Sequence, residues 1–234
     1  MCGRYSLTTP AEAMRHLFGF AGALPNLPAR YNIAPTQLVP IVRRMREGAR
    51  ELAQLRWGLI PSWAKDASIG NRLINARAEG LAEKPSFRAA FRARRCLVPA
   101  DGFYEWQATP QGKRPYRIGL KGGRAEALPL FAFAGLWERW EKAPDGVPVE
   151  SCTIVTTAAN ELLAPIHARM PVILPEEGYA AWLAPATPPA EALALLKPYP
   201  AAAMVLYPVS KRVNSVRFDD ALCIAPESTE PSLL

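Results

Sequence analysis

The feature that most constrains the fold is a succession of short β-rich runs that end at turn residues. Two of them, residues 38–45 and 51–59, are separated by Glu47-Gly48, a pair typical of a hairpin turn. Further runs of this kind occupy residues 3–8, 96–107, 115–120, 129–136, 151–158, 172–174 and 204–209. Helical patterns are fewer, at residues 9–18, 85–95, 176–183 and 189–197. The chain is therefore expected to combine β-sheet with a few short helices.

Two helices and one loop can be predicted in more detail. Thr9 is expected to cap the first helix, with Glu12 completing a capping box and Gly19 ending the helix. Residues 138–148 are charged and rich in turn formers, which indicates a surface loop. The second helix is expected to turn one apolar face inward and one basic face outward, with Phe87, Ala90 and Phe91 on the first and Arg88, Arg92 and Arg95 on the second.

The length and the cysteines exclude several classes of protein. The 234 residues suffice to bury a core, as one large domain or two small ones. No apolar run is long enough for a membrane span and no signal peptide is visible, so we expect a cytoplasmic protein. The cysteines form no CxxC pair, and neither a glycine-rich phosphate loop nor an HExxH motif occurs, so no metal or cofactor is expected. Three cysteines in apolar company should be small buried side chains: Cys96, Cys152 and Cys223.

The excess of positive charge points to an anionic partner. Lysine and arginine number 28 against 21 acidic residues, which gives a net charge of +7. Arginine binds two phosphate oxygens at once through its planar fork. Two clusters raise the expectation of a polyanion, namely Arg43, Arg44 and Arg46, and then Arg88, Arg92, Arg94 and Arg95.

The N-terminus offers unusual chemistry. In Met1-Cys2-Gly3-Arg4 a cysteine follows the initiator methionine, which is normally removed before a small side chain. Cys2 would then carry an α-amine of pKa about 7.7–8.0 and a thiol of pKa about 8.5, both partly reactive near neutral pH. An amine and a thiol so placed can attack one aldehyde in turn and close a thiazolidine ring. The alternative is that Cys2 is an ordinary small residue at a frayed end.

Two short segments place polar side chains where they could act together. In residues 73–79 a strand would aim Asn75, Arg77 and Glu79 at one face, whereas a short helix would scatter them. In residues 96–107 Glu105 stands between Tyr104 and Trp106. A carboxyl against aromatic walls has its charged form disfavoured, which raises its pKa towards the range useful for proton transfer. An exposed glutamate that alternates with buried rings is the alternative.

One histidine and two tryptophans complete the candidates. His167 lies in a loop between two prolines and beside Arg169, so it is a candidate base, although a structural role remains open. Trp57 and Trp63 flank a Gly and a Pro. They could stack on nucleobases or fill the core, and the sequence leaves both open.

Taken together, the motifs of this chain closely resemble the SOS response-associated peptidase family, also called abasic site processing proteins. The resemblance spans residues 2 to 215 and rests on eight motifs in order: Cys2-Gly3-Arg4, Tyr31-Asn32-Ile33-Ala34-Pro35, Trp57-Gly58-Leu59-Ile60-Pro61, Ile74-Asn75-Ala76-Arg77-Ala78-Glu79, Arg95-Cys96-Leu97-Val98-Pro99, Gly102-Phe103-Tyr104-Glu105-Trp106, Ile166-His167-Ala168-Arg169-Met170-Pro171 and Pro208-Val209-Ser210.

The resemblance implies an α+β fold, a single domain around a curved, largely antiparallel and barrel-like sheet with peripheral helices. We expect the domain to cover residues 1–225 and residues 226–234 to form a frayed tail. It also implies a positively charged cleft for single-stranded DNA and a thiazolidine crosslink between Cys2 and abasic sites, which are aldehydes in their ring-opened form.

The resemblance assigns roles residue by residue. Cys2 matches the nucleophile, Asn75 a residue that holds the N-terminus and the sugar, Glu105 the acid and base near the imine, and His167 a base for ring opening and reversal. Phosphate or sugar contacts match Arg4, Arg77 and Arg169. Positions that line the DNA cleft match Asn32, Pro35, Trp63, Trp106 and Thr156.

Three functions remain distinguishable at this point. The first is the crosslinking protein, a monomer acting on single-stranded DNA, with strand cleavage by β-elimination as a side activity and peptidase activity limited to removing Met1. The second is a thiol hydrolase or peptidase that uses an N-terminal cysteine. The third is a module that binds single-stranded DNA without a covalent bond.

Overall fold

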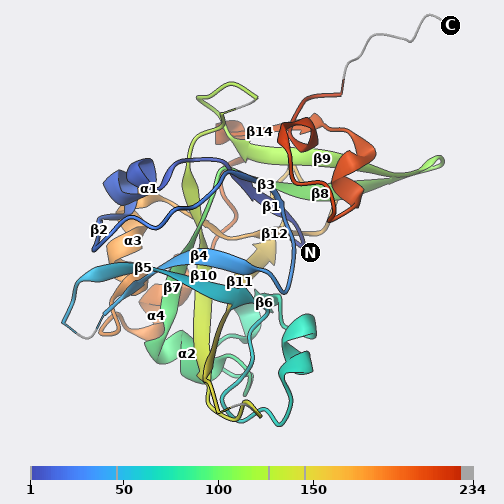
Figure 1. The fold of residues 1–234 in the computed structure, drawn as a ribbon. Helices are drawn as coiled ribbons and strands as arrows, with labels where there is room; N and C mark the ends of the chain where they lie inside the picture. Colours follow the sequence, from blue (N-terminus) through green and yellow to red (C-terminus); the bar gives the residue numbers. More distant parts are fainter. Residues whose placement is uncertain (1, 46, 126, 145, 228–234) are drawn as a thin grey trace, which may run out of the picture.

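The computed structural model describes residues 2–45, 47–125, 127–144 and 146–227, which fold into two sheets flanked by short helices (Figure 1). The described part of the smaller sheet has five strands in the order β14, β9, β8, β1 and β3. Their bounds are β1 (Tyr5–Leu7), β3 (Arg30–Ile33), β8 (Gly102–Thr109), β9 (Gly112–Leu120) and β14 (Met204–Pro208). Every pairing in this sheet is antiparallel.

The larger sheet follows the order β12, β11, β10, β7, β4, β5 and β2, with β13 beside β10 and β6 beside β11. Its bounds are β2 (Phe20–Ala21), β4 (Leu38–Arg44), β5 (Arg50–Trp57), β6 (Asn75–Arg77), β7 (Arg95–Ala100), β10 (Phe131–Trp140), β11 (Val149–Ala158), β12 (Arg169–Pro171) and β13 (Ile173–Leu174). Parallel pairing is confined to β2 with β5 and to β11 with β5 and β6. The predicted α+β class with a largely antiparallel sheet is therefore confirmed, as is the hairpin of β4 and β5.

The helices are short and peripheral. They are α1 (Ala11–Phe18), α2 (Arg88–Ala93), α3 (Tyr179–Leu183) and α4 (Pro189–Ala194). In Figure 1, α2, α3 and α4 lie on the side of the larger sheet away from the hairpin of β8 and β9. Short 3-10 helices connect the other elements: η1 (Ala67–Arg72), η2 (Ala78–Gly80), η3 (Glu176–Gly178), η4 (Ala201–Ala203), η5 (Lys211–Asn214) and η6 (Ala221–Cys223). Within the described ranges no helix is long and apolar enough to cross a membrane.

An aromatic cluster joins the two sheets. The Tyr5 ring of β1 meets Trp57 of β5 at 5.3 Å and Phe133 of β10 at 5.9 Å, both edge to face. Phe103 of β8 adds a third contact, with its ring 5.9 Å from Phe133. Edge-to-face pairs add about 0.5–1.5 kcal/mol each beyond their buried area. Trp57 is fully buried here, so it is a core residue, while Trp63 is 50% exposed.

Asp101 is the corner at which the chain passes from one sheet to the other. It separates β7 of the larger sheet from β8 of the smaller one, and its carboxylate is buried with the guanidinium of Arg117 (Oδ1 to Nη2, 3.0 Å). The same carboxylate accepts hydrogen bonds from the hydroxyls of Ser6 and Thr8, each at 2.7 Å. Gly102 follows because a Cβ there would lie 2.6 Å from the Arg117 Nε. The corner thus fixes β1 against β8.

Four local predictions need correction. Helix α1 begins after Pro10 without a side-chain cap, since the Thr9 hydroxyl lies 3.5 Å from Asp101 Oδ2 instead. Arg95 is buried on β7, where its guanidinium donates to the carbonyls of Phe91, Trp182 and Ala184. Glu79 belongs to η2 and not to the strand of Asn75 and Arg77, because the chain turns after β6.

The fourth correction concerns residues 138–148, of which 138–140 continue β10 because they pair with 149–151 of β11. Other predictions of the same kind are confirmed: Gly19 ends α1 with a φ of 62°, and Phe87, Ala90 and Phe91 are buried while Arg88 and Arg92 are exposed. Cys96, Cys152 and Cys223 are fully buried.

The boundary between a domain of residues 1–225 and a tail stays a prediction. Pro226 bridges to Val209, and the Glu227 amide donates to Pro208, so both contact the smaller sheet. Residues 228–234 lie outside the described residues, as do Met1 and Arg46.

We expect Asp101→Ala to lower the free energy of unfolding by about 3–5 kcal/mol, because it leaves the Arg117 cation buried and unpaired. Urea unfolding measures the change. Glu141→Ala is the matched control: the Arg139–Glu141 pair spans 3.1 Å with both side chains more than half exposed, and its loss should cost less than about 1 kcal/mol. Equal costs for the two variants would contradict a special role for the corner.

Candidate functional site

Four of the predicted site residues line one hollow of about 420 Å³. They are Arg4, Glu105, Trp106 and His167, and Lys113 and Asn214 complete the wall. Arg4 directly precedes β1, Glu105 and Trp106 lie on β8, and His167 lies in the loop before β12. The fold therefore brings together residues that are more than a hundred positions apart in the sequence.

Glu105 is the acidic group of this hollow. It lies in β8 between the fully buried Tyr104 and the half-buried Trp106, and only 4% of it is exposed, which excludes the alternative of an exposed glutamate. Burial raises the pKa of the Glu105 carboxyl, against the opposing effect of nearby His167. A carboxyl with a raised pKa keeps its proton to a higher pH than an ordinary glutamate, which suits it to donate as well as to accept a proton.

Cys2 lies in the interior, three residues before β1. Its side chain is fully buried, and its Sγ is 3.9 Å from the carbonyl oxygen of Arg4. Burial raises the pKa of the Cys2 thiol well above its usual range, and the nearby Glu105 carboxylate raises it further. The expectation of a thiol partly ionised near neutral pH is therefore wrong for this structure, and a base must accept the proton. The removal of Met1, which lies outside the described residues, stays a prediction.

Arg4 is held in place by uncharged partners. Its Nη1 donates to Asn32 Oδ1 at 2.7 Å and to the Val213 carbonyl at 2.8 Å, and its guanidinium lies 5.9 Å from the centre of the Trp106 ring. Asn32 is fully buried, and its amide nitrogen donates to three backbone carbonyls between residues 213 and 218. The structure thus places Asn32 behind the wall of the hollow, where it positions Arg4.

A second group of predicted residues gathers around β11. In the register, Thr156 pairs with Arg77 of β6 on one side and with Pro171 of β12 on the other. Arg169 binds both carboxylate oxygens of Glu79, at 2.7 and 3.0 Å, and donates to the Thr156 carbonyl at 2.7 Å. Arg77 is exposed, whereas Thr156 is buried. These contacts make Arg77 the accessible cation of this group.

His167 is oriented by the backbone of Arg169. Its Nδ1 lies 2.9 Å from the Arg169 amide nitrogen and 3.0 Å from the Arg169 carbonyl oxygen. A neutral ring accepts the amide N–H at Nδ1 and so carries its own proton on Nε2. The backbone of Arg169 therefore fixes the orientation of the ring and favours the tautomer that is protonated on Nε2.

Asn75 has an unusual buried amide. Neither its Nδ2 nor its Oδ1 has a hydrogen-bond partner in the described structure, although both atoms are shielded from solvent. Buried amide atoms are nearly always paired in folded proteins, because an unpaired one costs about 1–3 kcal/mol. Asn75 thus carries a donor and an acceptor that no described residue pairs, on the strand that also carries Arg77.

Pro35 and Trp63 do not line the 420 Å³ hollow. Pro35 precedes Thr36, whose φ of 74° marks a tight turn after β3. Trp63 is half exposed, and its indole N–H donates to the Pro85 carbonyl at 3.3 Å. The sequence in turn missed Lys113 and Asn214, although Trp106 donates to the Asn214 side chain at 2.7 Å. The family motif nearest to Asn214 in the sequence, Pro208-Val209-Ser210, ends four residues before it.

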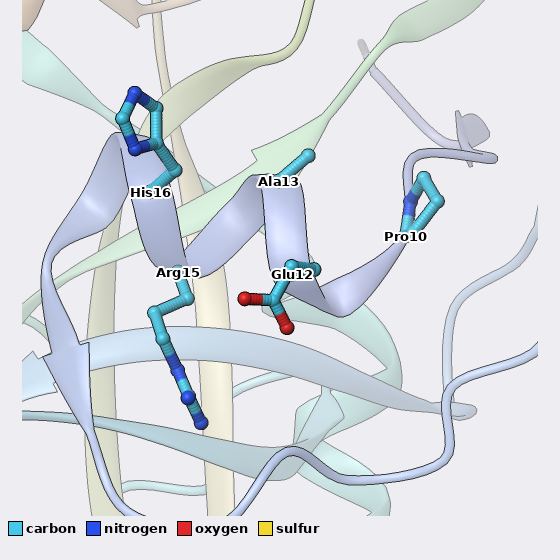
Figure 2. Close-up of a pocket in the computed structure, with 5 residues that line it drawn as sticks. All are labelled: Pro10, Glu12, Ala13, Arg15 and His16. Atoms are coloured by element: carbon cyan, nitrogen blue, oxygen red, sulfur yellow. The ribbon is translucent and has the colours of Figure 1, made fainter.

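Another hollow, of about 620 Å³, lies along α1, but the side chains that line it do not suggest a reaction (Figure 2). Its lining includes Glu12, Arg15 and His16, which project from α1 in different directions in Figure 2. None of the predicted site residues belongs to it. The described residues also contain no group of three or more His, Cys, Asp and Glu side chains that could hold a metal ion.

The fold and the site define a class of small α+β protein in which a cysteine at the second position is buried near a carboxyl and a basic, aromatic-walled hollow. Comparison with known proteins identifies the class. The model of the SOS response associated peptidase (SRAP) family matches residues 1–216, and the chain belongs to this family.

Relatives and solved structures agree with this assignment. The abasic site processing protein YoqW of Bacillus subtilis is 44% identical over 100% of this chain and 99% of its own. The abasic site processing protein HMCES of Gallus gallus is 34% identical over 84% of this chain and 66% of its own. A crystal structure of a protein from Bacteroides thetaiotaomicron has a TM-score of 0.85 and 30% identity, and covers 95% of this chain and 98% of that one.

We expect Asn75→Leu to raise the free energy of unfolding by about 1 kcal/mol, because it removes a buried amide without breaking a hydrogen bond. Asn160→Leu is the matched control. The Asn160 amide donates to the Tyr199 carbonyl at 2.7 Å and accepts from the Leu163 amide at 3.1 Å, so its loss should destabilise the protein by about 1–3 kcal/mol. Urea unfolding of both variants measures these two changes in the free energy of unfolding. A lower free energy of unfolding for Asn75→Leu would show that the Asn75 amide has a hydrogen-bond partner.

Proposed function

We propose that this protein binds single-stranded DNA at abasic sites and forms a covalent thiazolidine crosslink through Cys2 once Met1 has been removed. The observation that carries the proposal is the convergence of the Cys2-bearing segment, Glu105 and His167 with the cation of Arg4 at one hollow. The names of relatives such as YoqW and HMCES, abasic site processing proteins, support the same substrate.

The chemistry needs two bonds to one sugar carbon. The Cys2 amine adds to the aldehyde carbon C1′ of the ring-opened sugar, and the oxygen leaves as water to give an imine. The thiol then adds across the imine, so that Sγ bonds to C1′ and its proton passes to the nitrogen. Glu105 moves protons in both steps, since burial raises the pKa of its carboxyl. Closing the ring within one residue gives the second step a large effective concentration of thiol.

His167 serves the sugar in the proposed scheme. It transfers a proton to or from the 4′ oxygen, which opens the sugar and, in reverse, releases the adduct. The hydrogen bond from the Arg169 amide to Nδ1 supports this role, because it holds the ring in one orientation with the ring proton on Nε2. Asn75 holds the sugar and the new N-terminus with its unpaired amide.

The scheme includes two lesser activities. An imine at C1′ acidifies the C2′ proton, so β-elimination and strand cleavage compete with ring closure. Peptidase activity is limited to self-processing, in which the loss of Met1 creates the reactive amine.

We place the protein in the cytoplasm as a monomer associated with DNA.

DNA binding in this proposal does not depend on base sequence. Arg4, Arg77 and Arg169 contact phosphates or the sugar, and Trp106 and Trp63 stack on bases, with Pro35 beside them. Aromatic faces accept any base, and phosphate contacts by arginine predict strong salt dependence. Single strands are preferred because a sugar inside a stacked duplex is hard to reach.

The defining experiment is a denaturing gel of the protein incubated with abasic single-stranded DNA. We expect a slow-migrating adduct with the wild type and none with Cys2→Ala. An adduct that persists in Cys2→Ala would remove Cys2 from the centre of the reaction. DNA binding without an adduct in the wild type would favour the non-covalent module, and the intact mass of the purified chain shows whether Met1 is absent.

The rate of crosslinking should depend on the ionisation of Glu105. Burial raises the pKa of this carboxyl, so the crosslinking rate should fall as the pH drops through the raised pKa. The inflection in a plot of rate against pH should therefore lie above the ordinary glutamate pKa of about 4.3. Glu105→Gln should lack this inflection and keep only the fall that protonation of the Cys2 amine causes below its pKa of about 7.7–8.0. It should also crosslink about 10²-fold more slowly or worse, with unchanged DNA affinity. Single-turnover rates across this pH range give the answer.

His167→Ala is the control for the pH experiment. It should keep the inflection and still crosslink, but release DNA more slowly than the wild type. If the inflection above the ordinary glutamate value survives in Glu105→Gln, it belongs to another group. Normal release from His167→Ala would leave His167 a structural residue.

A further inference from the structure

A second hollow, of about 350 Å³, adjoins the candidate site. It lies at the end of the hairpin of β8 and β9, where its lining includes Lys113, Arg114, Lys211 and Glu227. Lys113 also lines the 420 Å³ hollow that contains Glu105 and His167. The two hollows therefore share one lysine. We call the residues that lead from the first hollow to the second, Trp106, Lys113 and Lys211, the lysine track.

The register of the hairpin places the first two of these residues on one face. Lys113 pairs with Ala108, and Trp106 pairs with Pro115, two positions further along each strand. Cross-strand partners share a face, and so do residues two apart, which makes Trp106 and Lys113 diagonal neighbours within reach of long side chains. The aromatic ring can stack on a nucleobase, and the neighbouring ammonium group can bind the phosphate that follows this base.

The charges of the lysine track are not used within the protein. Arg114 is paired with Glu227 (Nη2 to Oε2, 2.9 Å), so these two groups offset each other. Lys113 and Lys211 are both exposed, and neither takes part in an ion pair among the described residues. Two cations without an internal partner thus continue the positive potential that Arg4 begins in the first hollow.

We propose that one flank of the bound single strand leaves the abasic-site hollow over Trp106 and follows the lysine track, where Lys113 and Lys211 bind its phosphates. From Trp106 to the end of β8 at Thr109 the strand rises by about 10 Å, so the track serves the nucleotides next to the lesion. The inference rests on the proposed function for the position of the lesion, but the affinity of the lysines for a single strand does not require a crosslink.

The test measures reversible binding, with Cys2→Ala present in every protein so that no crosslink forms, to single strands that extend from the abasic site on the 5′ side only, on the 3′ side only, or on both. Fluorescence anisotropy at several salt concentrations gives the slope of log K against log salt. For single strands each phosphate contact contributes about 0.7 to this slope. We expect the slope to fall by about 1.4 in Lys113→Ala/Lys211→Ala and by about 0.7 in Lys211→Ala, and only for oligonucleotides that carry one particular flank.

The matched control is Lys142→Ala/Lys197→Ala, which removes two other exposed lysines and should bind as the wild type does. The proposal is overturned if the slope is unchanged in the track variants, if both flanks lose affinity equally, or if the control loses as much. An undamaged oligothymidylate separates the two hypotheses. Should the wild type form no adduct, the proposed function fails, while the slopes on this probe still show whether the two lysines bind the strand.

Discussion

The buried ion pair of Asp101 and Arg117 is the interaction on which the rest of the structure depends. It stands where the chain leaves the larger sheet and enters the smaller one, and both side chains are withdrawn from water. Desolvation cancels much of the attraction within such a pair, so the pair adds little stability by itself. The pair instead makes the fold specific. The Asp101 carboxylate has all its hydrogen bonds only when the hydroxyls of Ser6 and Thr8 donate to it, which fixes the position of β1.

The same exclusion of water sets the chemistry at the end of β1. Cys2 precedes that strand by three residues, and Glu105 follows the corner by four, so one rigid junction places both. Burial then raises the pKa of each group and keeps the thiol protonated. A protonated thiol resists oxidation and stray electrophiles. In the proposed reaction it acts only after an imine has formed beside it, where Glu105 can accept its proton.

How much of the fold and of the site could be predicted from the sequence depends on how far apart in the chain the residues that determine each feature lie. The hairpin of β4 and β5 follows from adjacent residues, a turn pair between two β-rich runs, and it was predicted. The sequence left the burial of Glu105 open against an exposed glutamate, and only the fold decides between the two. Arg95 was placed on a helix surface because helical periodicity continues to it, whereas pairing with β4 and β10 draws that stretch into β7. Lys113 and Asn214 were missed because a contact between a hairpin and η5 leaves no local pattern.

Two asparagines show what hydrogen-bond accounting adds to a motif. Sequence resemblance put Asn32 and Asn75 in the same site, yet the Asn32 amide is saturated by Arg4 and the backbone while that of Asn75 is unpaired. The difference extends to the arginines. Arg169 is neutralised by Glu79, whereas Arg4 is held by an amide and a carbonyl, which fix its guanidinium without cancelling its charge. A cation positioned by neutral groups keeps its full attraction for an anion, and for this reason the buried Asn32 matters to the electrostatics of a site whose surface it does not reach.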